Sequence, residues 1–327
     1  MKNQKLNSAI IVLVSRSKLF KTTIELFYKN WNYKYKYPIY VHTFGKVFSN
    51  IEKNHLKKKY KNIFFEEISP RVPKHIKEKS LFYYRFYNDY AFKSFSPRRL
   101  GYLHMCNFAS NINSFGKMGC LSNKLKKYDF LMRIDDDSWF KKKISYDFFK
   151  KLKSNPMATG RLTITNGDYI SLTREKLFEF ISYYVKKNKL KIKNKTLNFV
   201  LKQNDQKKLN LIPYSLGNFD LYNMKILKKK KFQQFIGDIN KFGGIYKYRW
   251  ADYDLINLFL YLHFQRPIFD FKLSKNTYEA SHPLTKRITS PIINFRKISV
   301  KEIFHFFFYL IEKRLFKFCE LFKSNIL

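Results

Sequence analysis

The sequence predicts an α/β domain with a mixed, largely parallel central sheet and helices on both of its faces. Short apolar runs alternate with helical patterns in the first half of the chain. Residues 10–14 form an apolar run of strand length, and Leu19, Ile24 and Phe27 follow at helical spacing. With 327 residues and 45% hydrophobic content, the chain is also long enough to bury a sizeable core.

Further elements continue this alternation. The apolar runs at 38–41, 63–65, 128–134 and 267–271 are expected to be strands, and helical patterns cover 101–111, 174–186 and a segment that ends near Leu262. We expect one catalytic domain over 1–290, with a nucleotide-binding half at 8–125, a metal and acceptor half at 126–290 and a basic exposed insertion near 186–208. A basic aromatic helical extension is expected over 291–327, and its part at 303–323 could contact a membrane surface or simply cap the domain.

The composition limits the possible functions. The formal net charge of +41 favours an anionic partner such as nucleic acid, an acidic membrane face or a diphosphate, but the lysines are spread along the chain and match an AT-rich codon usage. Cys106, Cys120 and Cys319 form neither a disulfide framework nor a metal-binding spacing, so they leave the redox compartment open. No signal peptide or membrane-spanning segment is expected, which favours a cytoplasmic or peripheral membrane location.

Three consecutive aspartates are the strongest chemical signal in the sequence. Asp135, Asp136 and Asp137 follow a buried strand, where their mutual repulsion requires a cation or hydrogen-bond donors. Mg²⁺ and Mn²⁺ are commonly held by one or two carboxylates together with substrate phosphates. If the backbone stays extended, Asp135 and Asp137 point to one side and Asp136 to the other. This strand and D-x-D arrangement is typical of nucleotide-sugar transferases, although a helix cap or an acidic loop would also place aspartates there.

Several other residues are candidates for the same reaction. Arg133 and Arg249 could bind donor phosphates, and the loop after the first strand adds Ser15 and Arg16 at the edge where ligands bind in parallel sheets. His282 could supply an imidazole ligand to the metal.

Asp220 and Asp252 lie in apolar, aromatic surroundings that require a reason for a carboxylate. One of them could act as a nucleophile or stabilise an oxocarbenium-like centre, and the other could act as a base or anchor an acceptor hydroxyl. Helix capping by Asp252, or its pairing with Arg249, is the structural alternative.

The motifs taken together resemble glycosyltransferase family 15, the fungal α-1,2-mannosyltransferases. Seven blocks match in order and cover roughly residues 8 to 285; they lie at residues 9–14, 31–38, 101–110, 128–135, 218–220, 243–252 and 278–283. The resemblance implies a GT-A fold, GDP-mannose as donor, Mn²⁺ as metal, with Mg²⁺ as a substitute, and a mannoside glycan or glycolipid as acceptor. It also implies retention of configuration at the anomeric carbon, and family analogy adds a Golgi-type compartment as an alternative location.

The resemblance also assigns roles to individual residues. Asp135 takes the position of the family's metal-site glutamate, His282 that of its metal-binding histidine and Tyr102 that of a donor-site tyrosine. Asp220 lies where the family has a glutamate proposed as nucleophile or transition-state stabiliser, and Asp252 matches an active-site aspartate.

This chain departs from the family pattern at several places. Aspartate replaces glutamate at both Asp135 and Asp220, Asp136 replaces a proline, the loop before Tyr128 is longer, and His282 is displaced by one residue.

Three other functions compete with this hypothesis. A related transferase could use another nucleotide sugar. A basic nucleic-acid-binding protein would place aromatic and lysine side chains together on one face, whereas the aromatic residues here fall largely in apolar strands and helices. Nucleic acid is therefore not expected as a partner. A metal phosphohydrolase could use the same aspartates and would release inorganic phosphate or a free sugar phosphate.

Overall fold

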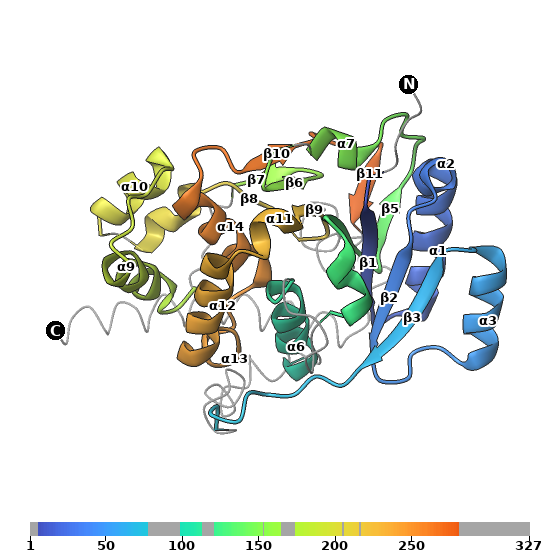
Figure 1. Cartoon of the computed structure of the whole chain (residues 1–327), viewed down its shortest axis with the longest axis horizontal. Helices are drawn as coiled ribbons and strands as arrows, with labels where there is room; N and C mark the ends of the chain where they lie inside the picture. The colour runs from blue at the N-terminus through green and yellow to red at the C-terminus, as the bar shows by residue number, and fades with distance from the viewer. Residues whose placement is uncertain are drawn as a thin grey trace, which may run out of the picture. The chain divides into compact units, whose positions relative to one another are not determined.

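The computed structural model describes residues 6–77, 99–112, 121–152, 154–164, 174–204, 206–215 and 217–280 (Figure 1). Contacts divide the chain into two units, one formed by residues 1–76 and 103–281 and the other by residues 77–102 and 282–327. Most of the second unit lies outside the described residues. The expected C-terminal extension over 291–327 and its segment 303–323 are therefore not described.

The strands and helices alternate as expected for an α/β domain. The strands are β1 (Ser8–Val14), β2 (Ile39–Phe44), β3 (Ile63–Ile68), β4 (Phe130–Asp135), β5 (Ser138–Phe140), β6 (Met157–Thr159), β7 (Leu162–Thr163), β8 (Tyr214–Ser215), β9 (Phe219–Asn223), β10 (Ile268–Asp270) and β11 (Tyr278–Ala280). The helices and helical turns are α1 (Ser17–Phe27), η1 (Tyr28–Asn32), α2 (Tyr33–Tyr35), α3 (Asn50–Lys59), α6 (Arg99–Ser110), η3 (Asn123–Lys127), α7 (Phe148–Leu152), α9 (Leu177–Lys187), α10 (Lys195–Lys202), η4 (Gln206–Leu211), α11 (Met224–Leu227), α12 (Lys230–Phe242), α13 (Gly244–Tyr248) and α14 (Asp252–His263).

Seven strands form the central sheet in the order β10-β6-β9-β4-β1-β2-β3. The neighbours of β1 and β2 are parallel to them, and β10 is parallel to β6, whereas β9 runs antiparallel to both β4 and β6. Two small antiparallel ladders, β11 with β5 and β7 with β8, lie beside the sheet. The expected mixed, largely parallel sheet is confirmed.

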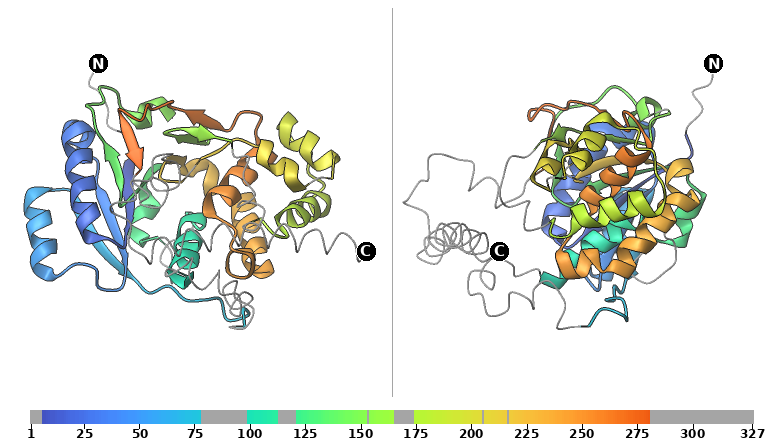
Figure 2. Two further views of the ribbon diagram at one scale, coloured as in Figure 1. Left: turned by 180° about the vertical axis from the view of Figure 1, so that it is seen from behind. Right: turned by 90° about the vertical axis from the view of Figure 1, so that its left-hand side faces the viewer.

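The alternation of side chains along β1 separates the two faces of the sheet. Ile10, Val12 and Val14 point into a core that also contains Phe20 of α1 and Leu56 of α3, so these two helices cover one face (Figures 1 and 2). On β2, Val41 belongs to the same core, whereas the next residue, His42, contacts Phe108 of α6 with ring centroids 5.2 Å apart. Helix α6 therefore packs on the opposite face.

The apolar runs in the sequence correspond closely to the main strands. The runs at 10–14, 38–41, 63–65, 128–134 and 267–271 fall in β1, β2, β3, β4 and β10. Strand β1 is buried on both faces over nearly its whole length, which explains its continuous apolar sequence.

The lysine-rich stretch near 186–208 is not a plain loop. It contains α10, which begins after Asn194, whose side chain accepts a hydrogen bond from the Leu197 amide at 2.9 Å. Leu197 and Val200 of this helix are buried, while its lysines are exposed. The stretch therefore presents basic side chains on a folded helix.

Within the described ranges, no helix is both long enough and apolar enough to cross a membrane.

A pair of glycines, one at the end of α12 and one at the start of α13, makes close packing possible around Trp250. Gly243 ends α12 with φ at 81°, and a Cβ added to Gly244 would lie 2.0 Å from the Cε3 atom of Trp250, which is fully buried. Alanine at 244 would therefore require the indole or the backbone to move.

We expect Gly244→Ala to lower the free energy of unfolding by about 1–3 kcal/mol, measured by urea denaturation. Gly237→Ala is a matched control, because an added Cβ on this α12 glycine meets nothing within 4 Å. The control should be stabilised by about 0.5–1 kcal/mol, since alanine is the better helix former. Equal stabilities of the two variants would show that the Trp250 contact does not constrain this segment.

Candidate active site

The aspartate run lies at the carboxyl end of β4, beside the carboxyl end of β1, where Ser15 and Arg16 follow. β4 pairs in parallel with β1, which places Asp135 opposite Leu13 at the end of the β1–β4 ladder. From β1 the chain continues to β2 on one side, whereas β4 lies on the other. The crevice at such a reversal of strand order is where ligands bind in open α/β sheets.

The expected extended geometry of the aspartate run is wrong. β4 ends at Asp135, and residues 136 and 137 form a turn before β5 begins at Ser138. The alternation of side chains along a strand therefore does not continue past Asp135. Its side chain is 26% exposed, whereas those of Asp136 and Asp137 are 4% and 0% exposed.

Asp136 turns toward the loop that joins β1 to α1. Its Oδ2 accepts hydrogen bonds from the backbone amides of Ser15 and Arg16, both at 2.9 Å, and its Oδ1 accepts from Arg16 Nε at 3.0 Å and from the Nη2 atom. Arg16 Nη1 also pairs with Asp137 Oδ2 at 2.9 Å. Partial burial lowers the pKa of Arg16, but these two carboxylates outweigh it and leave the pKa raised. Arg16, expected to bind the donor, thus lies between two aspartates.

A second guanidinium group, that of Arg133, pairs with Asp135. Arg133 pairs with Asp252 through Nη1 and with Asp135 through Nη2 at 3.3 Å. Asp252 is the first residue of α14 and is only 2% exposed. The N-terminus of this helix has no capping hydrogen bond from a side chain, and the Asp252 carboxylate pairs with Arg133 instead. Burial lowers the pKa of Arg133, but the charges of Asp252 and Asp135 raise it well above its ordinary value. Both arginines are therefore cationic.

We call these residues the aspartate–arginine cluster: the run 135–137 and Asp252 with Arg16 and Arg133. When ionised, the four carboxylates exceed the two guanidinium groups by two negative charges, which one divalent cation would offset. Asp135 has a carboxylate of the type that Mn²⁺ and Mg²⁺ prefer. In the described segments, no three or more His, Cys, Asp or Glu side chains are arranged so that they could hold a metal ion, so the other ligands would come from substrate phosphates or from residues outside these segments.

Asp220 is fully buried on the same face of the sheet as Arg133. The two residues are opposite each other in the β4–β9 ladder, and β9 places Phe219 and Leu221 in the core on the other face. Asp220 accepts hydrogen bonds from Ser215 Oγ and from the Tyr222 hydroxyl, the latter at 3.0 Å. Burial raises the pKa of Asp220 to about 6, although the Ser215 hydrogen bond and the Arg133 charge oppose the shift. This carboxyl group can change its ionisation near neutral pH.

The remaining expected site residues are less fully described. Tyr102 is half-buried in the first turn of α6, and Arg249 is half-buried after α13 with φ at 59°, a backbone conformation that is uncommon for arginine. Arg249 precedes Asp252 by three residues. His282 lies outside the described residues. The roles assigned to these three side chains stay predictions.

Asn218 and Tyr278, which the sequence alone does not identify as site residues, stabilise the turn at 136–137. The Asn218 carbonyl accepts hydrogen bonds from the Asp135 amide at 3.1 Å and from Ser138 Oγ at 3.0 Å. The Tyr278 hydroxyl lies 3.0 Å from Ser138 Oγ and 3.1 Å from Asn218 Oδ1, so its single hydrogen is shared between these two acceptors. Asn218 and Tyr278 both belong to motifs visible in the sequence, but only the fold shows that they meet.

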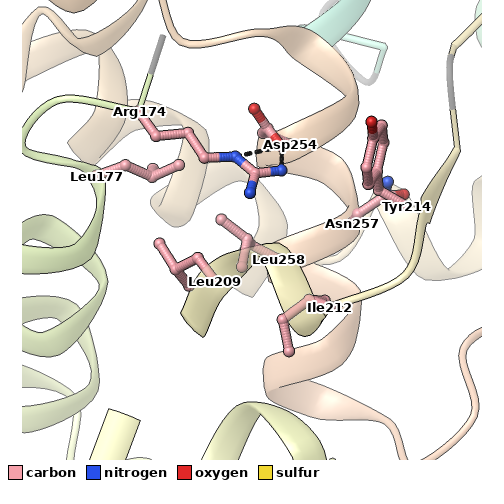
Figure 3. Close-up of a pocket in the computed structure, with 8 residues that line it drawn as sticks. All are labelled: Arg174, Leu177, Leu209, Ile212, Tyr214, Asp254, Asn257 and Leu258. Carbon is pink, nitrogen blue, oxygen red and sulfur yellow. Dashed lines mark hydrogen bonds and ion pairs between the residues drawn. The ribbon is translucent and has the colours of Figure 1, made fainter. Parts of the chain in front are cut away.

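The first turn of α14 contains a second buried ion pair. Asp254 accepts from Arg174 Nε at 3.1 Å and Nη2 at 2.5 Å beside a cavity of about 10 Å³, roughly the size of one water molecule (Figure 3). Asp254 Oδ2 and both amide atoms of Asn257 are buried and lack a hydrogen-bond partner among the described residues. These unpartnered polar atoms thus lie beside a cavity whose lining is otherwise largely apolar.

The fold is shared with solved mannosyltransferase structures. The mannosyltransferase Ktr4p from S. cerevisiae superposes with a TM-score of 0.66 and 20% identity over 84% of this chain and 70% of that one. Its complex with GDP gives a TM-score of 0.66 at 19% identity, covering 84% and 71%. The Mn/GDP form of core-mannan synthase A from Aspergillus fumigatus gives a TM-score of 0.68 at 17% identity, covering 85% and 76%. These likenesses show the fold.

Sequence comparison identifies the family. A direct comparison with curated proteins gives no match. A model of the glycolipid 2-alpha-mannosyltransferase family matches residues 1–284, which includes the aspartate–arginine cluster, Asp220 and the position of His282. The match extends over most of the chain and confirms the resemblance seen in the motifs. This chain therefore belongs to the glycolipid 2-alpha-mannosyltransferase family.

Proposed function

We propose that this protein is a retaining α-mannosyltransferase, of α-1,2 type, that transfers mannose from GDP-mannose to a mannosylated glycan, glycoprotein or glycolipid. The family match supports the sugar, and the structures of similar fold in Mn/GDP and GDP forms support the nucleotide and the cation. The position of Asp135 is the observation that best supports the proposal. Its partly exposed carboxylate ends β4 at the reversal of strand order, within a cluster that has an excess of negative charge.

The cation is assigned to Asp135, with Asp137 and His282 as further proposed ligands. Mn²⁺, or Mg²⁺ in its place, would offset the negative charge that develops on the leaving diphosphate. Asp137 is buried against Arg16, so Asp135 is the more accessible of the two carboxylates.

The donor diphosphate is proposed to lie beside the arginines of the cluster. Arg133 presents a cationic guanidinium group 3.3 Å from Asp135, next to the proposed cation. Arg16, Arg249 and Tyr102 are further donor-binding candidates. Because Arg133 is held by Asp252 through a buried ion pair, it can contribute charge at a fixed place without being reorganised during the reaction.

Two buried carboxyl groups are proposed to act at the sugar. Asp220, when ionised, would stabilise the positive charge that develops at the anomeric carbon or would act as nucleophile, and it supports retention of configuration in either role. Its hydrogen bonds from Ser215 and Tyr222 fix its orientation. Asp252 would contribute by holding Arg133 and by anchoring or deprotonating an acceptor hydroxyl.

Nucleotide release from a panel of nucleotide sugars, with Mn²⁺ and with or without mannosides, tests this function. We expect GDP release from GDP-mannose that increases with a mannoside acceptor, and NMR of the product should show an α-linkage. Release from a different nucleotide sugar alone would contradict the mannosyl assignment. Release of inorganic phosphate or free mannose phosphate without transfer would instead favour a phosphohydrolase.

Replacing Asp135 by asparagine tests the cation site. Asp135→Asn should lower metal-dependent transfer by roughly 10²–10³-fold, because it removes a charged ligand and leaves the fold intact. Asp129→Asn is a matched control, since this residue also lies next to β4 but its carboxylate is 38% exposed and pairs only loosely with Lys225, at 3.8 Å. Full activity of Asp135→Asn at ordinary Mn²⁺ concentrations would rule out the role.

A further inference from the structure

Asp136 is the member of the aspartate run to which the proposed reaction gives no role, yet it has the most hydrogen-bond donors. Its side chain is 4% exposed, and both of its carboxylate oxygens accept hydrogen bonds from the β1–α1 loop. Ser15 Oγ adds a longer contact at 3.4 Å. A carboxylate with this many donors, one of them charged, is held in a single orientation.

The backbone of the same residue is also tied down. Thr23 of α1 donates from Oγ1 to the Asp136 carbonyl at 2.8 Å, and both groups are buried. The peptide and the side chain of Asp136 are therefore held by one continuous segment, residues 15–23. Because Asp135 is the preceding residue, any movement of this peptide moves the Asp135 carboxylate as well.

The hydrogen bonds to Asp136 also occupy the backbone amides of the β1–α1 loop. Amides at the carboxyl end of a first strand commonly bind phosphate in doubly wound folds. In this chain, the Ser15 and Arg16 amides donate to Asp136 instead. The Asp136 carboxylate thus occupies the amides that could otherwise bind a phosphate. We therefore expect the donor phosphates to lie on the side of the turn where Asp135 is.

We propose that Asp136 and Arg16 form a positioning clamp, which fixes the turn after β4 to the β1–α1 loop and so sets the place of the Asp135 carboxylate toward the diphosphate and its cation. The inference rests on the proposed function. Asp136 acts through Asp135 and is therefore a positioning residue, and Arg16 takes this role in addition to the donor contact proposed above. The Arg16 guanidinium also offsets part of the negative charge of Asp136 and Asp137, which would otherwise repel the Asp135 carboxylate more strongly.

Asp136→Asn tests the clamp with GDP and Mn²⁺ as probes. This variant keeps the shape of the side chain but places an amide NH₂ among the donors of Arg16. We expect the Mn²⁺ concentration for half-maximal GDP binding, measured by calorimetry, to rise by about 10-fold or more, as is typical when a partner of a metal ligand is lost. Unchanged GDP binding and Mn²⁺ dependence would overturn the proposal.

A matched control separates positioning from a general loss of stability. Asp147 is also buried, accepts from the Tyr37 hydroxyl at 2.8 Å and caps the Phe149 amide at 3.0 Å. Asp147→Asn should lower the melting temperature and leave the Mn²⁺ dependence of GDP binding unchanged, at a temperature where both variants are folded. A shift of equal size in the control would also overturn the proposal.

Two further measurements keep the test decisive. If Asp136→Asn does not fold, Thr23→Val removes only the hydrogen bond to the Asp136 carbonyl, and it should still raise the Mn²⁺ requirement; no rise would contradict the clamp. Hydrogen exchange of the Ser15 and Arg16 amides needs no ligand and should accelerate in Asp136→Asn while the β2 amides stay protected. Wild-type protein that binds no Mn²⁺ and GDP would contradict the proposed function, whereas slow exchange in the variant would contradict the clamp.

Discussion

Asp220→Asn is expected to abolish transfer and, at the same time, to make the protein more stable at neutral pH. Removing the proposed nucleophile or charge stabiliser should lower kcat by on the order of 10²–10³-fold. The same change removes a carboxyl group whose ionised form is disfavoured by complete burial. Initial rates with GDP-mannose and thermal unfolding curves of both proteins measure the two effects.

The sign of the stability effect follows from the raised pKa of Asp220. This pKa is about 6 in the folded protein against an ordinary value of 3.8, so the folded state favours the protonated form. The carboxyl group does not affect the free energy of unfolding well below pH 3.8, where it is protonated in both states. As the pH rises through 6, stability is lost, by up to about 3 kcal/mol. Asparagine does not ionise, so the advantage of Asp220→Asn should grow between pH 4 and 7.

The same pKa predicts an acid limb for the wild-type reaction. If the ionised form of Asp220 is needed, kcat/KM should fall below about pH 6, where the free enzyme is protonated. Stability curves of wild type and Asp220→Asn that run parallel from pH 4 to 7 would contradict the raised pKa. Activity retained in the variant would contradict the catalytic role and leave the pKa argument untouched.

Arg133→Met should cost more stability than a change at any exposed arginine. The substitution leaves the buried carboxylate of Asp252 without its guanidinium partner and removes a neighbour of Asp135. Breaking a buried ion pair from one side typically costs about 3–5 kcal/mol. We expect a loss of this size in urea denaturation at pH 7, together with a loss of transfer activity.

A double-mutant cycle separates the two consequences. In Arg133→Met combined with Asp252→Leu, no buried charge of this pair is left uncompensated, so most of the stability should return. Activity should not return, because both the guanidinium group next to Asp135 and the Asp252 carboxylate proposed to act on the acceptor hydroxyl are missing. A double variant as unstable as Arg133→Met alone would show that packing, and not the unpaired Asp252, causes the loss.

The strands and the identity of the acidic residues could be predicted because their signals are local. A continuous apolar run such as residues 10–14 requires burial on both faces, and Asp135 follows such a run directly. The partners of these residues could not be predicted in the same way. Arg133 and Asp252 are 119 residues apart, and Asp136 and Arg16 are 120 residues apart. Such pairs form only when the sheet order brings β1, β4 and α14 together.

The conformation of the aspartate run could not be predicted for the same reason, because it depends on contacts with distant parts of the chain. Period-two alternation placed Asp137 beside Asp135, but that argument holds only while the backbone is extended. The turn at 136–137 is favoured by contacts with Ser15, Arg16 and Thr23, which come from a different part of the chain. The direction of β9 was equally hidden, since its short apolar sequence has no feature that distinguishes parallel from antiparallel pairing.

The pairing of β6 with β9 fixes the place of Asp220 in the sheet, although the chain between these two strands lies outside the central sheet. Thr159 lies opposite Asp220, so the chain leaves the sheet after β6 and returns to it at a neighbouring position. The β7–β8 ladder joins the two ends of the excursion at Leu162 and Ser215. Part of this excursion is tied to the rest of the domain, because Arg174 pairs with Asp254 and Ser215 donates to Asp220. Exchanges confined to the exposed face of the basic helix α10 would leave Asp220 in place, so natural variation or grafting could remodel that face while the carboxyl group keeps its position in the sheet.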